Sequence, residues 1–326
     1  MPLLRINATP EGLALHDADV SVRDKLTEAA CRAGPVIIMV HGYKYDPALP
    51  AHCPHRKIFG NRADSWPAAL GFGRGNADEG LGIAFGWHAR GPLRAVHQRA
   101  TQLGKSLADI ISQLNRLNPH RPIHVIAHSM GVETALSALA HLRPGGLRRM
   151  ILLAGASYAS RASALLDTPA GRAVEVFNIT SRENDLFDLA FERLVPASLS
   201  GDITIGQGVA APNVTTLQID CAATLTALAR LNIPIERSGH HVCHWSTYRR
   251  GGIMDFYSRL LRDPGAPGAR SLAAILPAAP APRWSGLRAV VSAPHQLMRA
   301  RWLALLVKKR IMAGSPAQEK RNEHAY

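Results

Sequence analysis

Long apolar runs are missing from this 326-residue sequence, and their absence excludes two classes of protein. No stretch reaches the roughly 18 consecutive apolar residues that a transmembrane helix requires. The opening residues, MPLLRINATPEG, also lack the apolar segment of a secretory signal peptide. We therefore expect a cytoplasmic protein, for which any contact with a membrane would be peripheral.

Cysteine is scarce and scattered. The chain has no C-x-x-C pair, and its four cysteines are Cys31, Cys53, Cys221 and Cys243. This distribution does not predict a disulfide framework. Two segments rich in His and Cys, 52–55 and 240–244, could together supply four zinc ligands, but their spacings match no familiar zinc pattern. We expect reduced thiols and no bound metal.

Acidic residues are too few to balance the basic ones. The sequence has 24 Asp and Glu against 38 Lys and Arg, a net charge of +14, which first suggests a nucleic-acid binder. However, residues 262–326 alone contain 11 of the basic and three of the acidic residues, so the basic excess lies mainly in the tail. The tail shows no basic patch interleaved with aromatic residues. We predict that the chain has no nucleic-acid partner.

Hydrophobic residues make up 47% of the chain, enough to build a substantial core. Short apolar segments alternate with longer segments whose apolar residues have helical spacing. Because strands that are apolar on both faces are typical of a covered parallel sheet, we predict an α/β fold with a mostly parallel central sheet, helices on both faces, and one domain over residues 1–261. The expected strands are 35–41, 81–87, 122–127, 149–154, 173–179 and 213–219, and the expected helices are 92–117, 131–141 and 253–261.

Two segments interrupt this alternation. Residues 43–80 form a long connection rich in Gly, Pro, His and Asp, which predicts a lid or binding loop. Residues 262–326 contain linker-like stretches such as DPGAPGAR and LPAAPAPR, and form a basic C-terminal extension. Within it, residues 295–311 could form a basic amphipathic helix, packed on protein or lying on an anionic membrane surface.

The strongest chemical signal is the pentapeptide AHSMG at 127–131, placed where an expected strand ends and a helix begins. A nucleophile elbow needs this sharp turn, because the turn lifts the serine hydroxyl above the sheet. Ser129 is therefore the candidate nucleophile, with Ala127 standing where a first glycine is usual. A serine that only caps the helix is the alternative.

An oxyanion hole requires two backbone N–H groups that converge on the reacting carbonyl oxygen. In an elbow architecture one comes from the residue after the nucleophile and the other from a loop after an earlier strand. These would be the amides of Met130 and Tyr43, since HGY at 41–43 follows the first buried strand. The imidazole of His41 needs no catalytic role.

The acid and the base of a triad should follow the serine in that order. Asp185, after the strand ending in Ile179, is our candidate acid, and Glu183 and Asp188 are its rivals. For the base we prefer His244, because it lies nearest the closing helix and beside aromatic residues.

Two further histidines in the same segment, His240 and His241, remain open as alternative bases.

At these residues the chain resembles the α/β-hydrolase superfamily, and it looks most like a poorly characterised bacterial branch of serine hydrolases with an AHSMG elbow. The matching segments are HGY at 41–43, AFGWHARG at 84–91, AHSMG at 127–131, ITSREND at 179–185 and HWSTYRR at 244–250. The resemblance implies a Ser-His-Asp hydrolase with no cofactor.

Together these features predict a serine hydrolase that cleaves a small-molecule acyl ester, of carboxylesterase or lipase type, through Ser129, His244 and Asp185. The alternative is a protein with the same fold that has lost its chemistry and serves as a binding scaffold. The fold hosts many activities, so the sequence names neither the acyl chain, the leaving group nor the oligomeric state.

Overall fold

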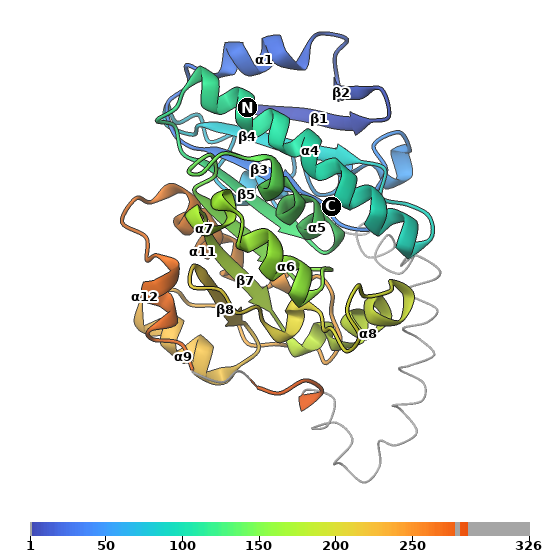
Figure 1. Cartoon of the computed structure of the whole chain (residues 1–326). Coiled ribbons are helices and arrows are strands. Elements are labelled where there is room, and N and C mark those ends of the chain that lie inside the picture. Colours follow the sequence, from blue (N-terminus) through green and yellow to red (C-terminus); the bar gives the residue numbers. More distant parts are fainter. Residues whose placement is uncertain (1, 278–280, 286–326) are drawn as a thin grey trace, which may run out of the picture. The chain divides into compact units, whose positions relative to one another are not determined.

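An eight-stranded sheet forms the centre of the computed structural model, which describes residues 2–277 and 281–285 (Figure 1). The strand order is β2-β1-β4-β3-β5-β6-β7-β8. All neighbouring pairs are parallel except β1 with β2, so the predicted mostly parallel sheet is confirmed. The strands are β1 (Leu3–Thr9), β2 (Gly12–Leu15), β3 (Val36–Val40), β4 (Leu81–Trp87), β5 (Ile123–His128), β6 (Arg149–Leu153), β7 (Glu175–Thr180) and β8 (Val214–Gln218).

The strand β3 shows why the sheet is covered on both sides. All five of its residues, VIIMV, are buried, because successive side chains point to opposite faces. Val36 and Ile38 enter one hydrophobic core, and Ile37 and Met39 enter a second core on the other face. A continuous apolar run in the sequence therefore corresponds to a strand between two layers of helices.

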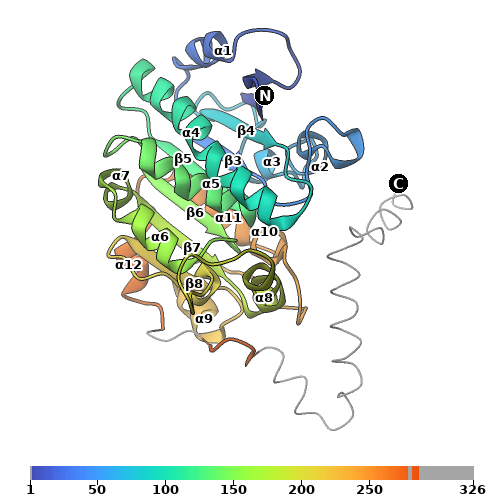
Figure 2. The same cartoon turned by 45° about the vertical axis from the view of Figure 1, so that its right-hand side comes forward.

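Helices contribute to each of these cores. The first core contains side chains from α1, α4, α5, α6 and α8, and the second contains side chains from α3, α9, α11 and α12. Figure 2 shows α4, α5 and α6 side by side on one face of the sheet. The main helices are α1 (Val22–Ala29), α2 (Pro54–Lys57), α3 (Trp66–Ala69), α4 (Leu93–Leu117), α5 (Met130–Ala138), α6 (Ala159–Leu166), α7 (Pro169–Ala173), α8 (Asp185–Leu194), α9 (Ala222–Arg230), α10 (Ser246–Arg249), α11 (Ile253–Arg262) and α12 (Ala269–Ala273), with short 3₁₀ turns at η1 (Pro50–His52), η2 (Leu139–His141), η3 (Arg182–Asn184) and η4 (Ile205–Gln207).

The segment 43–80 is more ordered than a bare loop. It contains η1, α2 and α3, and it buries Phe59, Trp66, Leu70 and Phe72 in the second core. These anchors fix much of the segment to the domain. Its role as a lid or binding loop stays a prediction.

The compact unit runs over Met1–Ala281, so the expected boundary at residue 261 falls inside it. The linker-like sequence there still packs, because Ala266, Ala269 and Leu272 are buried in the second core. The amphipathic helix predicted at 295–311 lies outside the described residues.

No helix in the described part of the chain is both long and apolar enough to span a bilayer.

Candidate functional site

Ser129 occupies a sharp turn between β5 and α5. Its φ of 54° and ψ of −122° lie in a region that residues with a side chain rarely adopt. The turn is held in place because the Ser129 N–H donates a hydrogen bond to the Leu153 carbonyl at 2.9 Å. A Cβ at position 131 would lie 2.4 Å from the His41 carbonyl oxygen, so only glycine fits there. The backbone therefore has the geometry of a nucleophile elbow.

The loop after β3 packs directly against this elbow. A Cβ at Gly42 would lie 2.7 Å from the Ser129 Cβ and 2.9 Å from the His128 carbonyl oxygen. Among the hydrogen bonds of the described residues, the backbone N–H groups of Tyr43 and Met130 have no acceptor. These two N–H groups lie in the segments that the sequence predicted for an oxyanion hole.

His41 is fixed by its own contacts. Its Nε2 accepts a hydrogen bond from the Trp87 N–H at 3.0 Å, and its Nδ1 donates to the Gly42 carbonyl at 2.9 Å. Burial lowers the pKa of His41 to about 3, against a smaller opposing effect of the Gly42 hydrogen bond. The neutral His41 imidazole, with both nitrogens hydrogen-bonded, therefore has a structural role in the loop after β3.

His128 connects the elbow to the segment that contains His244. Its Nε2–H donates to the His244 carbonyl at 3.1 Å, and the two rings have centroids 4.6 Å apart. The structure therefore brings the preferred base beside the residue that precedes the nucleophile, although the two are 116 positions apart in the chain. Burial lowers the pKa of His128 to about 4.

The partner of the His244 ring is an asparagine. The Asn184 Oδ1 lies 2.6 Å from the His244 Nδ1, and since a carbonyl oxygen only accepts, Nδ1 carries the proton. The Nε2 of His244 is then the basic nitrogen. The Phe187 ring stacks on His244 at 4.6 Å between centroids and fixes its plane. Burial, with the nearby His128, lowers the pKa of His244 well below its ordinary value.

Asp185, the expected acid, makes a different contact. Its Oδ1 pairs with the buried Arg182 guanidinium at 3.3 Å. Asn184 ends η3 and Asp185 begins α8, and consecutive positions on a helical turn point in different directions. The structure thus places Asn184 at the position against His244 that we had predicted for Asp185.

The alternative candidates for the acid and for the base lie in different environments. Glu183 is buried and pairs with Arg250 at 2.6 Å, which ties the segment after β7 to the segment of the base. Asp188 accepts a hydrogen bond from the Asn184 Nδ2 at 3.0 Å. His240 and His241 are exposed.

Sequence reasoning missed Asn184, although the residue lies inside the quoted ITSREND segment. A search limited to carboxylates could not find it. The only signal was its place between two acidic candidates after the correct strand.

In the described part of the chain, no group of three or more His, Cys, Asp or Glu side chains could hold a metal ion. Two residues of the zinc alternative, His55 and Cys53, have other partners. The His55 Nε2 bonds with the Asn7 Oδ1 at 2.7 Å, and the Cys53 Sγ lies 3.6 Å from the His16 Nε2.

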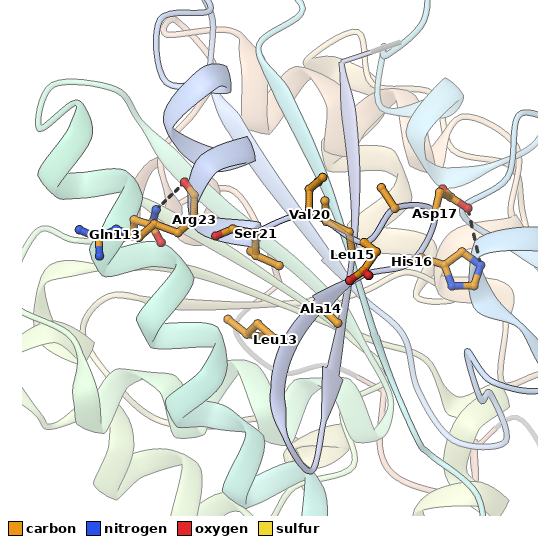
Figure 3. Close-up of a pocket in the computed structure, with 12 residues that line it drawn as sticks. Leu13, Ala14, Leu15, His16, Asp17, Val20, Ser21, Arg23 and Gln113 are labelled. Atoms are coloured by element: carbon orange, nitrogen blue, oxygen red, sulfur yellow. Dashed lines mark hydrogen bonds and ion pairs between the residues drawn. The ribbon is translucent and has the colours of Figure 1, made fainter.

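A surface hollow of about 890 Å³ lies elsewhere, at the edge of the sheet (Figure 3). It is lined by β2, the segment that leads to α1, and Gln113 of α4. Three strands separate β2 from β5 in the sheet order. This hollow is therefore distinct from the Ser129 site.

The order of the strands in the sheet and the elbow at Ser129 are those of the α/β-hydrolase fold. Residues 18–153 match the model of a family described as "Alpha/beta hydrolase of unknown function (DUF900)". No curated protein matches the sequence significantly.

Solved structures of three proteins resemble this one at low identity. TT1662 from Thermus thermophilus is 15% identical over 57% of this chain and 79% of its own, with a TM-score of 0.33. The mature lipase BlEst2 from Bacillus licheniformis is 13% identical over 57% and 83%, with a TM-score of 0.34. The cutinase from Trichoderma reesei, solved with a phosphonate inhibitor, is 13% identical over 44% and 61%, with a TM-score of 0.27.

Proposed function

We propose that the protein is a serine hydrolase that cleaves an acyl ester of carboxylesterase or lipase type. The observation that carries this proposal is the strained backbone of Ser129, which packs against the Gly42 loop and follows His128, a residue in contact with a histidine held in one tautomer. Strain of this kind persists only where the surrounding structure enforces it, and it concentrates at active sites.

In the proposed reaction, His244 Nε2 takes the proton of the Ser129 hydroxyl as its oxygen attacks the acyl carbon. The amides of Tyr43 and Met130 stabilise the negative charge on the carbonyl oxygen. His244 then gives the proton to the departing alcohol, and an ester bond joins the acyl group to Ser129. Water, deprotonated by the same nitrogen, releases the acid and restores the serine.

Asn184 is the residue that we propose holds the base. Replacing the carboxylate of a Ser-His-Asp triad by an amide is damaging mainly because it allows the wrong histidine tautomer. Here the amide oxygen faces Nδ1, which selects the productive tautomer. The Cys-His-Asn arrangement of papain-like proteases shows that an amide can serve in this position.

Turnover of p-nitrophenyl esters of increasing chain length tests the proposal. Ser129→Ala should lose hydrolysis by at least about 1,000-fold with an unchanged circular dichroism spectrum. Ser112→Ala, a matched serine in α4, should retain wild-type turnover. Wild-type-like turnover in Ser129→Ala would contradict the assignment, and a folded wild type that is inactive on all esters would favour the scaffold alternative.

A further inference from the structure

In a Ser-His-Asp triad the carboxylate accepts a hydrogen bond directly from the histidine. Here the Asn184 amide lies between His244 and the carboxylate of Asp188. We propose that Asp188 is a positioning residue that orients the base and stabilises its protonated form through the Asn184 side chain, so that the order of groups is Ser129, His244, Asn184, Asp188. This inference rests on the proposed hydrolase function, and it adds a residue whose effect can be measured separately.

From His244 to Asp188 the hydrogen bonds form an unbroken chain. The His244 Nδ1–H donates to the Asn184 Oδ1 at 2.6 Å, and the Asn184 Nδ2–H donates to the Asp188 Oδ1 at 3.0 Å. Asn184 and Asp188 are each 3% exposed. In such surroundings a hydrogen bond is electrostatically stronger than in water, and successive bonds polarise one another.

The amide orientation follows from the chemistry of its two neighbours. An ionised carboxylate has no proton to donate, so the Asn184 atom that faces Asp188 must be the NH₂ group. The oxygen then faces His244, whose Nδ1 must be the protonated nitrogen. Asp188 therefore selects the amide orientation, and the amide selects the tautomer that leaves Nε2 free to take a proton.

The position of the Asp188 carboxylate is tightly defined. A Cβ at Gly206 would lie 2.1 Å from the Asp188 Oδ2, so the carboxylate lies against bare backbone of η4. The Gly206 carbonyl accepts a hydrogen bond from Arg182 at 2.5 Å, and Arg182 also pairs with Asp185. Asn184 is the N-cap of α8 and Asp188 lies four residues further along the chain, about one helical turn, which brings the two side chains onto the same face.

Asp188→Asn tests the charge while preserving the shape. We expect kcat to fall about 10- to 100-fold, as for other residues that orient a catalytic group, with KM nearly unchanged. Loss of the negative charge should also shift the acid limb of kcat/KM to lower pH, because it destabilises the imidazolium of His244. A purely structural role would lower activity without moving that limb. Asp109→Asn, on an exposed face of α4, is the matched control and should behave as wild type.

The double variant Asn184→Asp with Asp188→Asn moves the carboxylate directly onto His244. It should recover activity relative to Asp188→Asn and shift the acid limb to higher pH. Equal kcat and pH profile in wild type and Asp188→Asn would overturn the inference, provided that wild type hydrolyses esters and a fluorophosphonate labels Ser129. Absence of both in the wild type would instead reject the proposed function.

A measurement on the wild type covers the case in which the variants do not fold. The ¹⁵N spectrum of the histidine side chains, with the His244 signals assigned by their loss in His244→Gln, should show the Nδ1–H tautomer at neutral pH. An Nε2–H tautomer for His244 would overturn the inference. Gly206→Ala, which displaces the Asp188 carboxylate without removing it, should lower kcat and change that spectrum.

Discussion

At the scale of single residues, the environment of His244 determines when the proposed base can act. Its ring lies between Phe187 and His128, and only the neutral form can take the proton of Ser129. Burial favours the neutral form, and a second imidazole beside it has the same effect. The site thus suits a base that stays neutral in mildly acidic solution.

The lowered pKa of His244 determines how the proposed activity depends on pH. Because the pKa of His244 is lowered well below 6.5, the base remains neutral as the pH falls through 6.5. We expect kcat/KM for a p-nitrophenyl ester to stay constant through that pH and to decline only in more acidic solution. The profile of the free enzyme checks this. An acid limb centred at or above pH 6.5 would contradict the burial of the base in the structure.

The residues of the site differ in how far the sequence could predict them. Ser129, His244, Tyr43 and Met130 follow from rules on strand ends and chain order, and the structure places all four segments together. Asn184 could not be predicted in the same way, because which of two adjacent side chains faces the base depends on where the turn η3 gives way to α8.

At the scale of elements, the close contact between the β3 loop and the elbow builds the proposed oxyanion hole. Gly42→Ala would place a methyl group 2.7 Å from the Ser129 Cβ, so the loop must move away. We expect kcat to fall about 100-fold, as for loss of one oxyanion donor. Gly239→Ala, where a Cβ meets nothing within 4 Å, is the matched control. Equal kcat for the two variants would argue against the assigned hole.

Helix α5 carries a buried carboxylate that joins it to its neighbours. Glu133 is fully buried and contacts the guanidinium of Arg161, and it accepts hydrogen bonds from the Ser157 hydroxyl at 2.7 Å and the Thr101 hydroxyl at 3.0 Å. Burial alone would raise the pKa of Glu133, but the nearby His97 together with these partners lowers it to about 2. The ionised form therefore stabilises the packing of α5.

Glu133→Gln should lower the free energy of unfolding by about 2–4 kcal/mol, since the Arg161 guanidinium and the His97 ring then face a neutral amide in place of a carboxylate. The effect has a defined sign with pH. A depressed carboxyl pKa stabilises the fold above about 4.5, and this contribution is lost as the pH falls toward 2. Denaturant unfolding at several pH values measures both.

Glu28→Gln, which removes an exposed pair with Lys25, should leave the free energy of unfolding nearly unchanged. Equal free energies of unfolding for Glu133→Gln and Glu28→Gln would show that the buried contacts of Glu133 stabilise the fold no more than the exposed ion pair of Glu28 does.

The fold was predictable wherever strands are buried on both faces. The segments 35–41, 81–87 and 122–127 stand out in the sequence as continuous apolar runs, and each contains a strand. The strands β1 and β2 lack this signal, because they lie at the partly exposed end of the sheet. Polar residues such as Arg5 and Asn7 interrupt the apolar pattern of β1, so the sequence alone does not predict this strand. Its pairing with β4 stabilises it in the sheet.

At the scale of the whole molecule, every residue of the proposed site lies within the compact unit Met1–Ala281. A chain ending at Ala281 should therefore fold and keep wild-type kcat on short esters. We also expect it to bind anionic vesicles less than the full chain, since the basic segment 295–311 is removed. Co-sedimentation with vesicles measures the second point. Equal vesicle binding by the two chains would contradict the membrane role of that segment.

The central claim is that Ser129 is an activated nucleophile. Intact-mass spectrometry after treatment with a fluorophosphonate, followed by peptide mapping, tests it most directly. The account predicts a single stoichiometric adduct on Ser129, formed slowly in Asn184→Ala and absent in Ser129→Ala. No adduct in the folded wild type, or an adduct on another serine, would contradict it.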